Sequence, residues 1–289
     1  MIDLHLHTNA SDGTLSLQEL AGQAEAAGLS AIAITDHDTV QSAARLDTLN
    51  TKLELIPGIE ISVYDNKLGY IDIHVLGLFI DPQDPRLLKT LDRLKMERED
   101  QKRAIVGKLN ELGFNITYED AKKHALGSVG RPHIARALME KYPDEFHSIG
   151  ECFDKLLDQG KPAFQSRTAY FCLDECIRMI HEVGGLSFLA HPGFYKYDIK
   201  TLLQDFKGLG GNGIETIYDY AANSVFRGFT QEDNKRISKQ MHDSARAFGF
   251  LESGGSDFHG PNKGAKLGIH DVPDWFLIAM KARLGERKD

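Results

Sequence analysis

The chain has 289 residues, 42% of them hydrophobic and 26% charged, and its formal net charge is −8. These values are ordinary for a globular protein of one large domain, or one domain with an insertion, and the negative charge argues against broad electrostatic binding of nucleic acid. No apolar run approaches the roughly 18 residues that a membrane span needs. The N-terminus shows no signal-peptide pattern and the three cysteines form no CxxC pair, so we expect a cytoplasmic protein with reduced thiols.

The first predicted element is a strand over residues 2–7, where apolar and polar residues alternate. His5 and His7 therefore project to the same side of this strand, where two imidazoles can hold one metal ion. Asp12 follows after a short polar loop and could reach the same place. A single His-x-His pair is weak evidence for a metal site, so its weight depends on whether similar residues recur along the chain.

The next elements alternate between helix and strand. Helices are predicted over 16–28 and 40–49, and strands over 31–35, 53–63 and 69–78. This order indicates the βα pattern of a parallel sheet or barrel, with one hairpin added between the last two strands.

Residues 84–167 interrupt this alternation. A long apolar stripe predicts one amphipathic helix that ends at Gly113, and a second helix is capped by Thr117 and Asp120. A third begins near Pro132, and a fourth covers about 149–157. Because no strand of length is predicted here, we interpret 84–167 as a helical insertion. It carries a net charge of +2, against −10 for the rest of the chain.

The alternation resumes in the last third of the chain, for which three more strands are predicted. They lie in 186–191, 213–219 and the strand-to-loop segment 250–260, and helices precede, separate and follow them. The total of about seven strands predicts a βα barrel made of 1–83 and 168–289. The active sites of such barrels lie at the C-terminal ends of the strands.

Metal-binding residue types gather at or near these predicted strand ends. The candidates are His5, His7, Asp12, His37, Glu60, His74, His191, Asp257 and His259. Any one of them could be an ordinary core or surface residue, but together they predict a multinuclear metal site. Imidazole with carboxylate is compatible with manganese, iron or zinc. Asp36 and Asp38 flank His37 and could orient ring nitrogens, although solvated loop carboxylates are an equal alternative.

The motifs DLHLHTNASDG, ITDHD, PGIEIS, HVLGL, AHPG and GSDFHG together resemble the polymerase and histidinol phosphatase (PHP) family of metal-dependent phosphoesterases. GRPHIARAL and GKPAF further resemble its bacterial subgroup of nucleoside 3′,5′-bisphosphate phosphatases and 5′→3′ exoribonucleases. The resemblance implies a distorted seven-stranded βα barrel with three divalent metals, manganese being expected first. His5, His7, Glu60 and Asp257 would hold the first ion, Glu60, His74 and His191 the second, and Asp12, His37 and His259 the third.

This resemblance implies hydrolysis of a phosphate ester of a small nucleotide, or of the 5′ end of short single-stranded RNA, by a hydroxide that bridges two metals and is held through Glu60. Arg131 and His133, at a predicted helix start in the insertion, are the expected phosphate binders. We expect no membrane partner and no binding of extended duplex. Two alternatives remain: a phosphatase of a non-nucleotide metabolite such as histidinol phosphate, and a structural module without activity.

Overall fold

The computed structural model describes residues 1–125, 129–165, 171–222, 228–261, 264–268 and 271–286. Its strands are β1 (Ile2–Leu6), β2 (Ala31–Ile34), β3 (Glu54–Asp65), β4 (Tyr70–Leu78), β5 (Leu186–Leu189), β6 (Gly213–Ile217) and β7 (Leu251–Gly254). The α-helices are α1 (Leu17–Ala26), α2 (Pro85–Glu111), α3 (Tyr118–Lys122), α4 (Arg131–Lys141), α5 (Ile149–Cys152), α6 (Leu173–Glu182), α7 (Ile199–Gly208), α8 (Gln231–Phe248) and α9 (Asp274–Gly285). Short helical turns are η1 (Ala43–Thr48), η2 (Phe153–Leu157) and η3 (Pro192–Phe194).

All seven strands belong to one sheet, in which they lie in the order of the chain. β3 pairs antiparallel with β4 and β4 with β5, whereas the other neighbours are parallel. The prediction of an α/β fold built on seven strands, with one hairpin, is therefore confirmed.

The two edges of the sheet meet, which gives the sheet its barrel-like curvature. Beyond β7, the Asp257 N–H donates to the carbonyl of His5 at 3.0 Å, and the His7 N–H donates to the carbonyl of Phe258 at 3.1 Å. Gly255 permits this approach, because a Cβ at that position would lie 2.5 Å from the Cβ of His5. The first and last strand ends are thereby held side by side.

Local signals in the sequence explain two of the helix starts. The predicted capping boxes of Ser16 with Glu19 and of Thr117 with Asp120 begin α1 and α3. The helix predicted over 40–49 is instead the short 3₁₀ turn η1, in which the Thr48 hydroxyl donates to the Arg45 carbonyl at 2.7 Å. Such a side-chain bond competes with the backbone bonds of a continuing α-helix.

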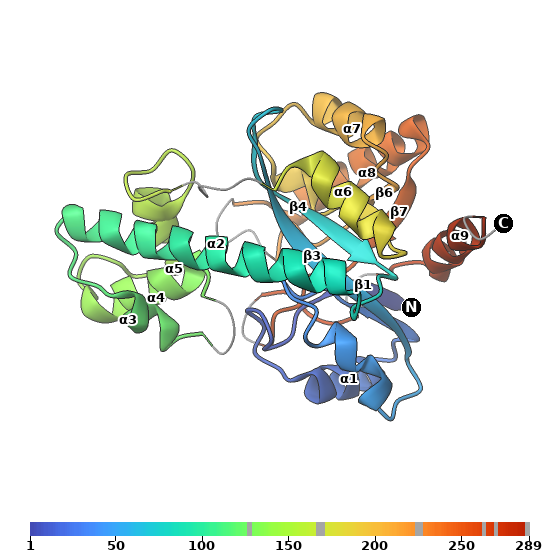
Figure 1. The fold of residues 1–289 in the computed structure, drawn as a ribbon, viewed down its shortest axis with the longest axis horizontal. Coiled ribbons are helices and arrows are strands. Elements are labelled where there is room, and N and C mark those ends of the chain that lie inside the picture. The colour runs from blue at the N-terminus through green and yellow to red at the C-terminus, as the bar shows by residue number, and fades with distance from the viewer. Residues whose placement is uncertain (126–128, 166–170, 223–227, 262–263, 269–270, 287–289) are drawn as a thin grey trace.

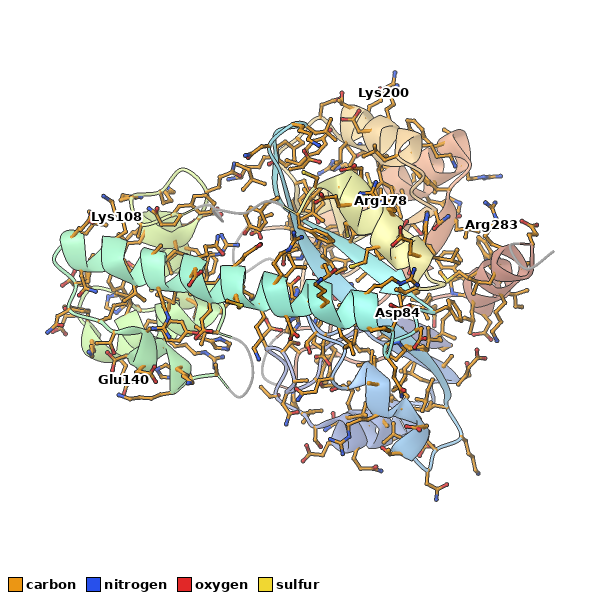
Figure 2. All side chains as sticks on the ribbon, in the orientation of Figure 1. Asp84, Lys108, Glu140, Arg178, Lys200 and Arg283 are labelled. Carbon is orange, nitrogen blue, oxygen red and sulfur yellow. The ribbon has the colours of Figure 1, made fainter. Side chains whose placement is uncertain are left out.

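α2 extends from the barrel into a lobe formed by α3, α4 and α5 (Figure 1). In Figure 2, Asp84 marks its start beside the barrel, and Lys108 and Glu140 lie in the lobe. The lobe has its own core, which includes Ile105 and Leu109 of α2, and its described residues contain no strand. The insertion over 84–167 stays a prediction, and its boundary at 167 lies outside the described residues. Within the part of the chain that the structure describes, no helix is long and apolar enough to cross a membrane.

Candidate metal centre

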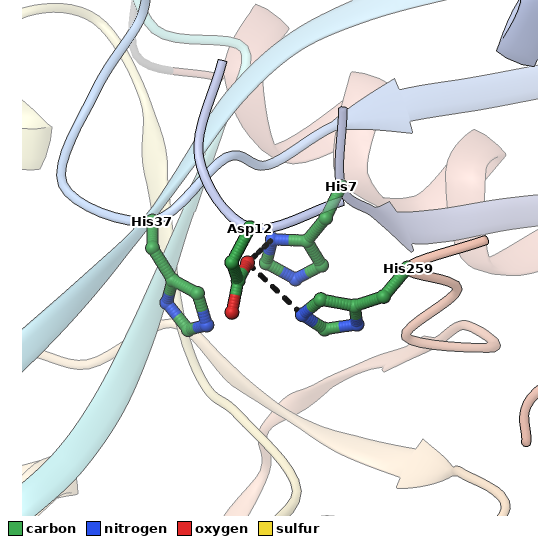
Figure 3. A group of neighbouring side chains, drawn as sticks. All are labelled: His7, Asp12, His37 and His259. Atoms are coloured by element: carbon green, nitrogen blue, oxygen red, sulfur yellow. Dashed lines mark ion pairs between the residues drawn. The ribbon is translucent and has the colours of Figure 1, made fainter. Parts of the chain in front are cut away.

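The structure brings all nine predicted metal-binding side chains to one place at the end of the barrel. One group contains His5, His7, Glu60 and Asp257, a second contains His7, Asp12, His37 and His259, and a third contains His37, Glu60 and His74. Within each group the possible ligand atoms lie within 4.8 Å of one another. The ninth residue, His191, has its Nε2 3.0 Å from Glu60 Oε1. Figure 3 shows the second group, in which Asp12 Oδ1 lies 3.2 Å from His259 Nε2.

Glu60, on β3, lies at the centre of the cluster and is only 1% exposed. Five imidazole nitrogens surround its carboxylate at 2.8–3.2 Å, and they belong to His5, His7, His37, His74 and His191. Asp257 and Glu215 add further carboxylate oxygens 3.0–3.4 Å from the rings of His5 and His7. Nitrogen and oxygen atoms of this kind, gathered in one small buried volume, are what a metal ion requires.

Several of the buried polar atoms make no hydrogen bond to any other described residue. They include both ring nitrogens of His7, His37 Nδ1 and Asp257 Oδ1. A buried polar atom without a partner costs about 1–3 kcal/mol, so a cluster of them needs a ligand. Nitrogen and carboxylate donors together suit divalent ions of intermediate softness. The residues present therefore fit a site for divalent metals.

The charges of the cluster support the same conclusion. Burial lowers the pKa of His7, but the carboxylates of Asp257 and Glu60, 3.0 Å and 3.2 Å from its Nε2, outweigh this effect and raise the pKa to about 10. Burial also lowers the pKa of His37, in this case to about 3, so that ring is neutral. The pKa of Glu60 lies well below its usual value despite burial, because histidine charges surround it. The carboxylates thus stay ionised and need nearby positive charge, which either protons or metal ions can provide.

A second layer of buried side chains orients the cluster, and the sequence reasoning missed it. Glu215, on β6, is fully buried, with Oε1 3.0 Å from His5 Nδ1, and its Oε2 accepts the His191 N–H at 2.7 Å. The Tyr218 hydroxyl donates to Asp257 Oδ2 at 2.6 Å. An acidic residue within the apolar strand around Ile214 was the signal that could have identified Glu215.

The hydrogen bonds described for Asp36 and Asp38 do not involve the histidine ring nitrogens that the sequence suggested as their partners. Asp36 accepts bonds from the backbone N–H and hydroxyl of Thr8, each at 2.7 Å, and from the Ser11 hydroxyl at 2.6 Å. It thereby fixes the loop that leads to Asp12. Asp38 accepts the Ser62 N–H at 3.0 Å and a guanidinium N–H of Arg98 at 2.8 Å.

The backbone at the mouth of the barrel is strained. Asp38, Asp72, His191 and Asp257 have φ angles of 51°, 60°, 30° and 52°, in the left-handed region that non-glycine residues seldom adopt. Each such residue costs on the order of 1–3 kcal/mol and is retained only where the surrounding structure enforces it. Two of the four are predicted metal ligands, and the other two lie within two residues of one.

Arg131 reaches the edge of the cluster from the first turn of α4. Its guanidinium forms an ion pair with Asp72, and lies 5.5 Å and 5.9 Å from the ring centres of Phe153 and Phe164. Asp72 Oδ1 in turn lies 3.8 Å from His74 Nε2, so one carboxylate separates Arg131 from the cluster. His133, the other predicted phosphate binder, is 4% exposed, and its Nδ1 accepts the Gly130 N–H at 2.9 Å.

A seven-stranded α/β fold with nine side chains that could hold metal ions at one end of its sheet is the architecture of a metal-dependent hydrolase. A family model described as the PHP domain matches residues 3–209. This chain belongs to the PHP domain family.

Two relatives and one solved structure match nearly the whole chain. A 5′-3′ exoribonuclease of Haemophilus influenzae is 34% identical over 271 residues, which are 92% of each chain. A 3′,5′-nucleoside bisphosphate phosphatase of Chromobacterium violaceum is 30% identical over 272 residues, which cover 92% of this chain and 89% of the other. The solved structure, an amidohydrolase from Chromobacterium violaceum with bound sulfate and no metal, is 28% identical, covers 98% of this chain and 96% of its own, and has a TM-score of 0.79.

Proposed function

We propose that this protein is a phosphoesterase that uses three divalent metal ions, manganese first and iron or zinc as alternatives. Its substrate is a small nucleotide of the nucleoside 3′,5′-bisphosphate type or the 5′ end of a short single-stranded RNA. The observation that carries the proposal is the carboxylate of Glu60 with five histidine nitrogens within 3.2 Å of it. The names of two relatives, a 5′-3′ exoribonuclease and a 3′,5′-nucleoside bisphosphate phosphatase, support this substrate class.

The nine residues divide into three ligand sets in this proposal. His5, His7, Glu60 and Asp257, which form one group in the structure, hold one ion. Glu60, His74 and His191 hold another, and both rings lie within 3.0 Å of the Glu60 carboxylate. Asp12, His37 and His259, which are grouped with His7 in the structure, hold the third. Bound divalent ions supply the Lewis acidity that turns a water molecule into a nucleophile near neutral pH. Glu60 contributes to two sets, so it sets the spacing between them.

The protein contributes orientation and charge to the reaction. Glu215 fixes the ring of His5 so that Nε2, and not Nδ1, faces Glu60. Asp36 holds the loop before Asp12 in place. Because this loop is already ordered, the third ligand set can bind an ion without a large loss of conformational entropy in the loop. Such preorganised groups stabilise a charged transition state more effectively than mobile ones, because they need not reorganise during the reaction.

The helical insertion over 84–167 acts as a substrate cap in this proposal. Arg131 and His133, at the start of α4, bind the second phosphate of the substrate or the next backbone phosphate of RNA. The ion pair of Arg131 with Asp72 holds its guanidinium beside the metal ligands. A cap at this position favours short, terminal substrates over a continuous duplex. A cytoplasmic location agrees with the three buried, free thiols.

A phosphate-release screen with manganese tests the proposal. Adenosine 3′,5′-bisphosphate and a short RNA with a 5′-phosphate are compared with histidinol phosphate. We expect the nucleotide substrates to be cleaved with the higher kcat/KM. A clear preference for histidinol phosphate would establish the metabolite phosphatase instead, and no metal-dependent release from any substrate would refute the phosphoesterase assignment.

A further inference from the structure

A second arginine of the insertion, Arg98 on α2, reaches the mouth of the barrel and belongs to none of the three proposed ligand sets. Its Nη1 lies 2.8 Å from Asp38 Oδ2, and its side chain is only 12% exposed. Asp38 directly follows the predicted ligand His37, and its N–H donates to the Glu60 carbonyl at 2.8 Å. Asp38 therefore connects Arg98 to the cluster, in the same way that Asp72 connects Arg131 to it.

Arg98 and Arg131 make similar contacts at the mouth of the barrel. Each pairs with an aspartate in the left-handed backbone region, Arg98 with Asp38 and Arg131 with Asp72. Arg98 also lies close to the start of α4, because its Nη2 is 3.9 Å from the place where a Cβ would stand on Gly130, the residue before Arg131. Two arginines from two helices of the insertion are thus each paired with an aspartate beside the metal cluster.

The ion pair with Asp38 uses only part of the Arg98 guanidinium. Nη1 faces the carboxylate, whereas Nε is buried and has no hydrogen-bond partner among the described residues. The Nε–Nη2 edge is the side of a guanidinium that binds two oxygens of one phosphate or carboxylate in parallel. A buried N–H without an acceptor is costly, so a bound phosphate oxygen at this edge would remove that cost.

We propose that Arg98 is a substrate-binding residue that, together with Arg131, contacts the second phosphate of a nucleotide whose first phosphate lies at the metal cluster. The inference rests on the proposed function, since it names the residue that distinguishes a bisphosphate from a monophosphate. The ligand class is a phosphate group on a small nucleotide. The competing role is purely structural: the Arg98–Asp38 pair would only fasten α2 to the barrel.

The two roles predict different results for variants on the two sides of the ion pair. Arg98→Met removes the guanidinium, Arg98→Lys keeps the charge without Nε, and Asp38→Asn removes only the carboxylate charge of the partner. Arg103→Met is the matched control, because Arg103 lies on the same helix with a side chain 53% exposed. Each protein is assayed with manganese on adenosine 3′,5′-bisphosphate and on the 3′- and 5′-monophosphates, and its metal content and thermal unfolding are measured.

We expect Arg98→Met to lower kcat/KM for the bisphosphate by about 10- to 100-fold, mainly through KM, which is the range for one lost bond to a charged group. The two monophosphates should change far less, and Arg98→Lys should recover only part of the loss. Asp38→Asn and Arg103→Met should keep the wild-type ratio between the bisphosphate and the monophosphates. Metal content should be the same in all four variants.

Equal losses on all three substrates in Arg98→Met and Asp38→Asn would overturn the inference and leave the pair as a fastening between α2 and the barrel. Full activity of Arg98→Met on the bisphosphate would also overturn it, as would a wild-type enzyme without preference for the bisphosphate. Phosphate release by the wild type decides the proposed function separately. If the wild type cleaves none of the nucleotides, the proposed function fails and the role of Arg98 fails with it.

Discussion

Replacing Glu60 with alanine should remove more than one metal ion, because two of the proposed ligand sets share this carboxylate. An ion present at 100 times its Kd stabilises the folded state by about 2.7 kcal/mol, so the loss of two ions removes about 5 kcal/mol. For a chain of this size, 1 kcal/mol corresponds to roughly 2 °C in Tm, and the metal-dependent part of Tm should fall by about 10 °C.

Elemental analysis after dialysis gives the metal content, and thermal unfolding with manganese or with a chelator gives the metal-dependent part of Tm. The control is Glu111→Ala, because the Glu111 side chain is 67% exposed at the far end of α2. The chelator should bring the wild type close to the variant. A Glu60→Ala protein that keeps its full metal content would refute the shared ligand.

Three further variants test other parts of the site. His37→Ala should depress turnover while the fold is retained, since it removes one ligand of the third ion, and wild-type activity under limiting metal would contradict that role. Arg131→Ala should lower kcat/KM for 3′,5′-bisphosphates by a factor that corresponds to about 2 kcal/mol, because a charge-assisted pair is lost. Simple monophosphate esters should be affected far less. Equal losses on both substrate classes would place Arg131 at the reacting phosphate. Glu215→Gln should weaken metal binding by roughly 10- to 100-fold in a metal titration, with unchanged circular dichroism, because the ring of His5 loses its anionic partner. Unchanged metal affinity would show that Glu215 is dispensable for that orientation.

The predicted cluster depended on a local property of the sequence. Candidate ligands such as His37 and His191 lie two or three residues after short apolar strands, and the ends of neighbouring strands in one sheet meet at one edge. In residues 2–7 the period-two pattern also indicated the side of the sheet on which the polar residues lie. These local signals were enough to gather all nine candidates into one cluster from the sequence, and their role as metal ligands stays a prediction.

The residues that support the cluster could not be found in the same way. Glu215 looks like one more polar residue within a strand, and its role depends on contact with His5, from which 210 positions separate it. Arg98 is one of several charged residues on a long amphipathic helix, and its partner Asp38 is 60 positions away. Periodicity shows which face of a helix is apolar, but it does not show what the opposite face meets.

α2 belongs to two hydrophobic cores at once. Its first half contributes Leu87, Leu91 and Leu94 to the core of the barrel, and its second half contributes Ile105 and Leu109 to the core of the lobe. Cutting the chain at residue 84 would thus uncover apolar barrel surface. A minimal barrel must keep the first three turns of this helix, so the boundary between the two folding units lies inside an unbroken helix. One continuous helix of about 40 Å consequently joins the lobe to the barrel, so any displacement of the lobe must bend this helix or disturb one of the two cores.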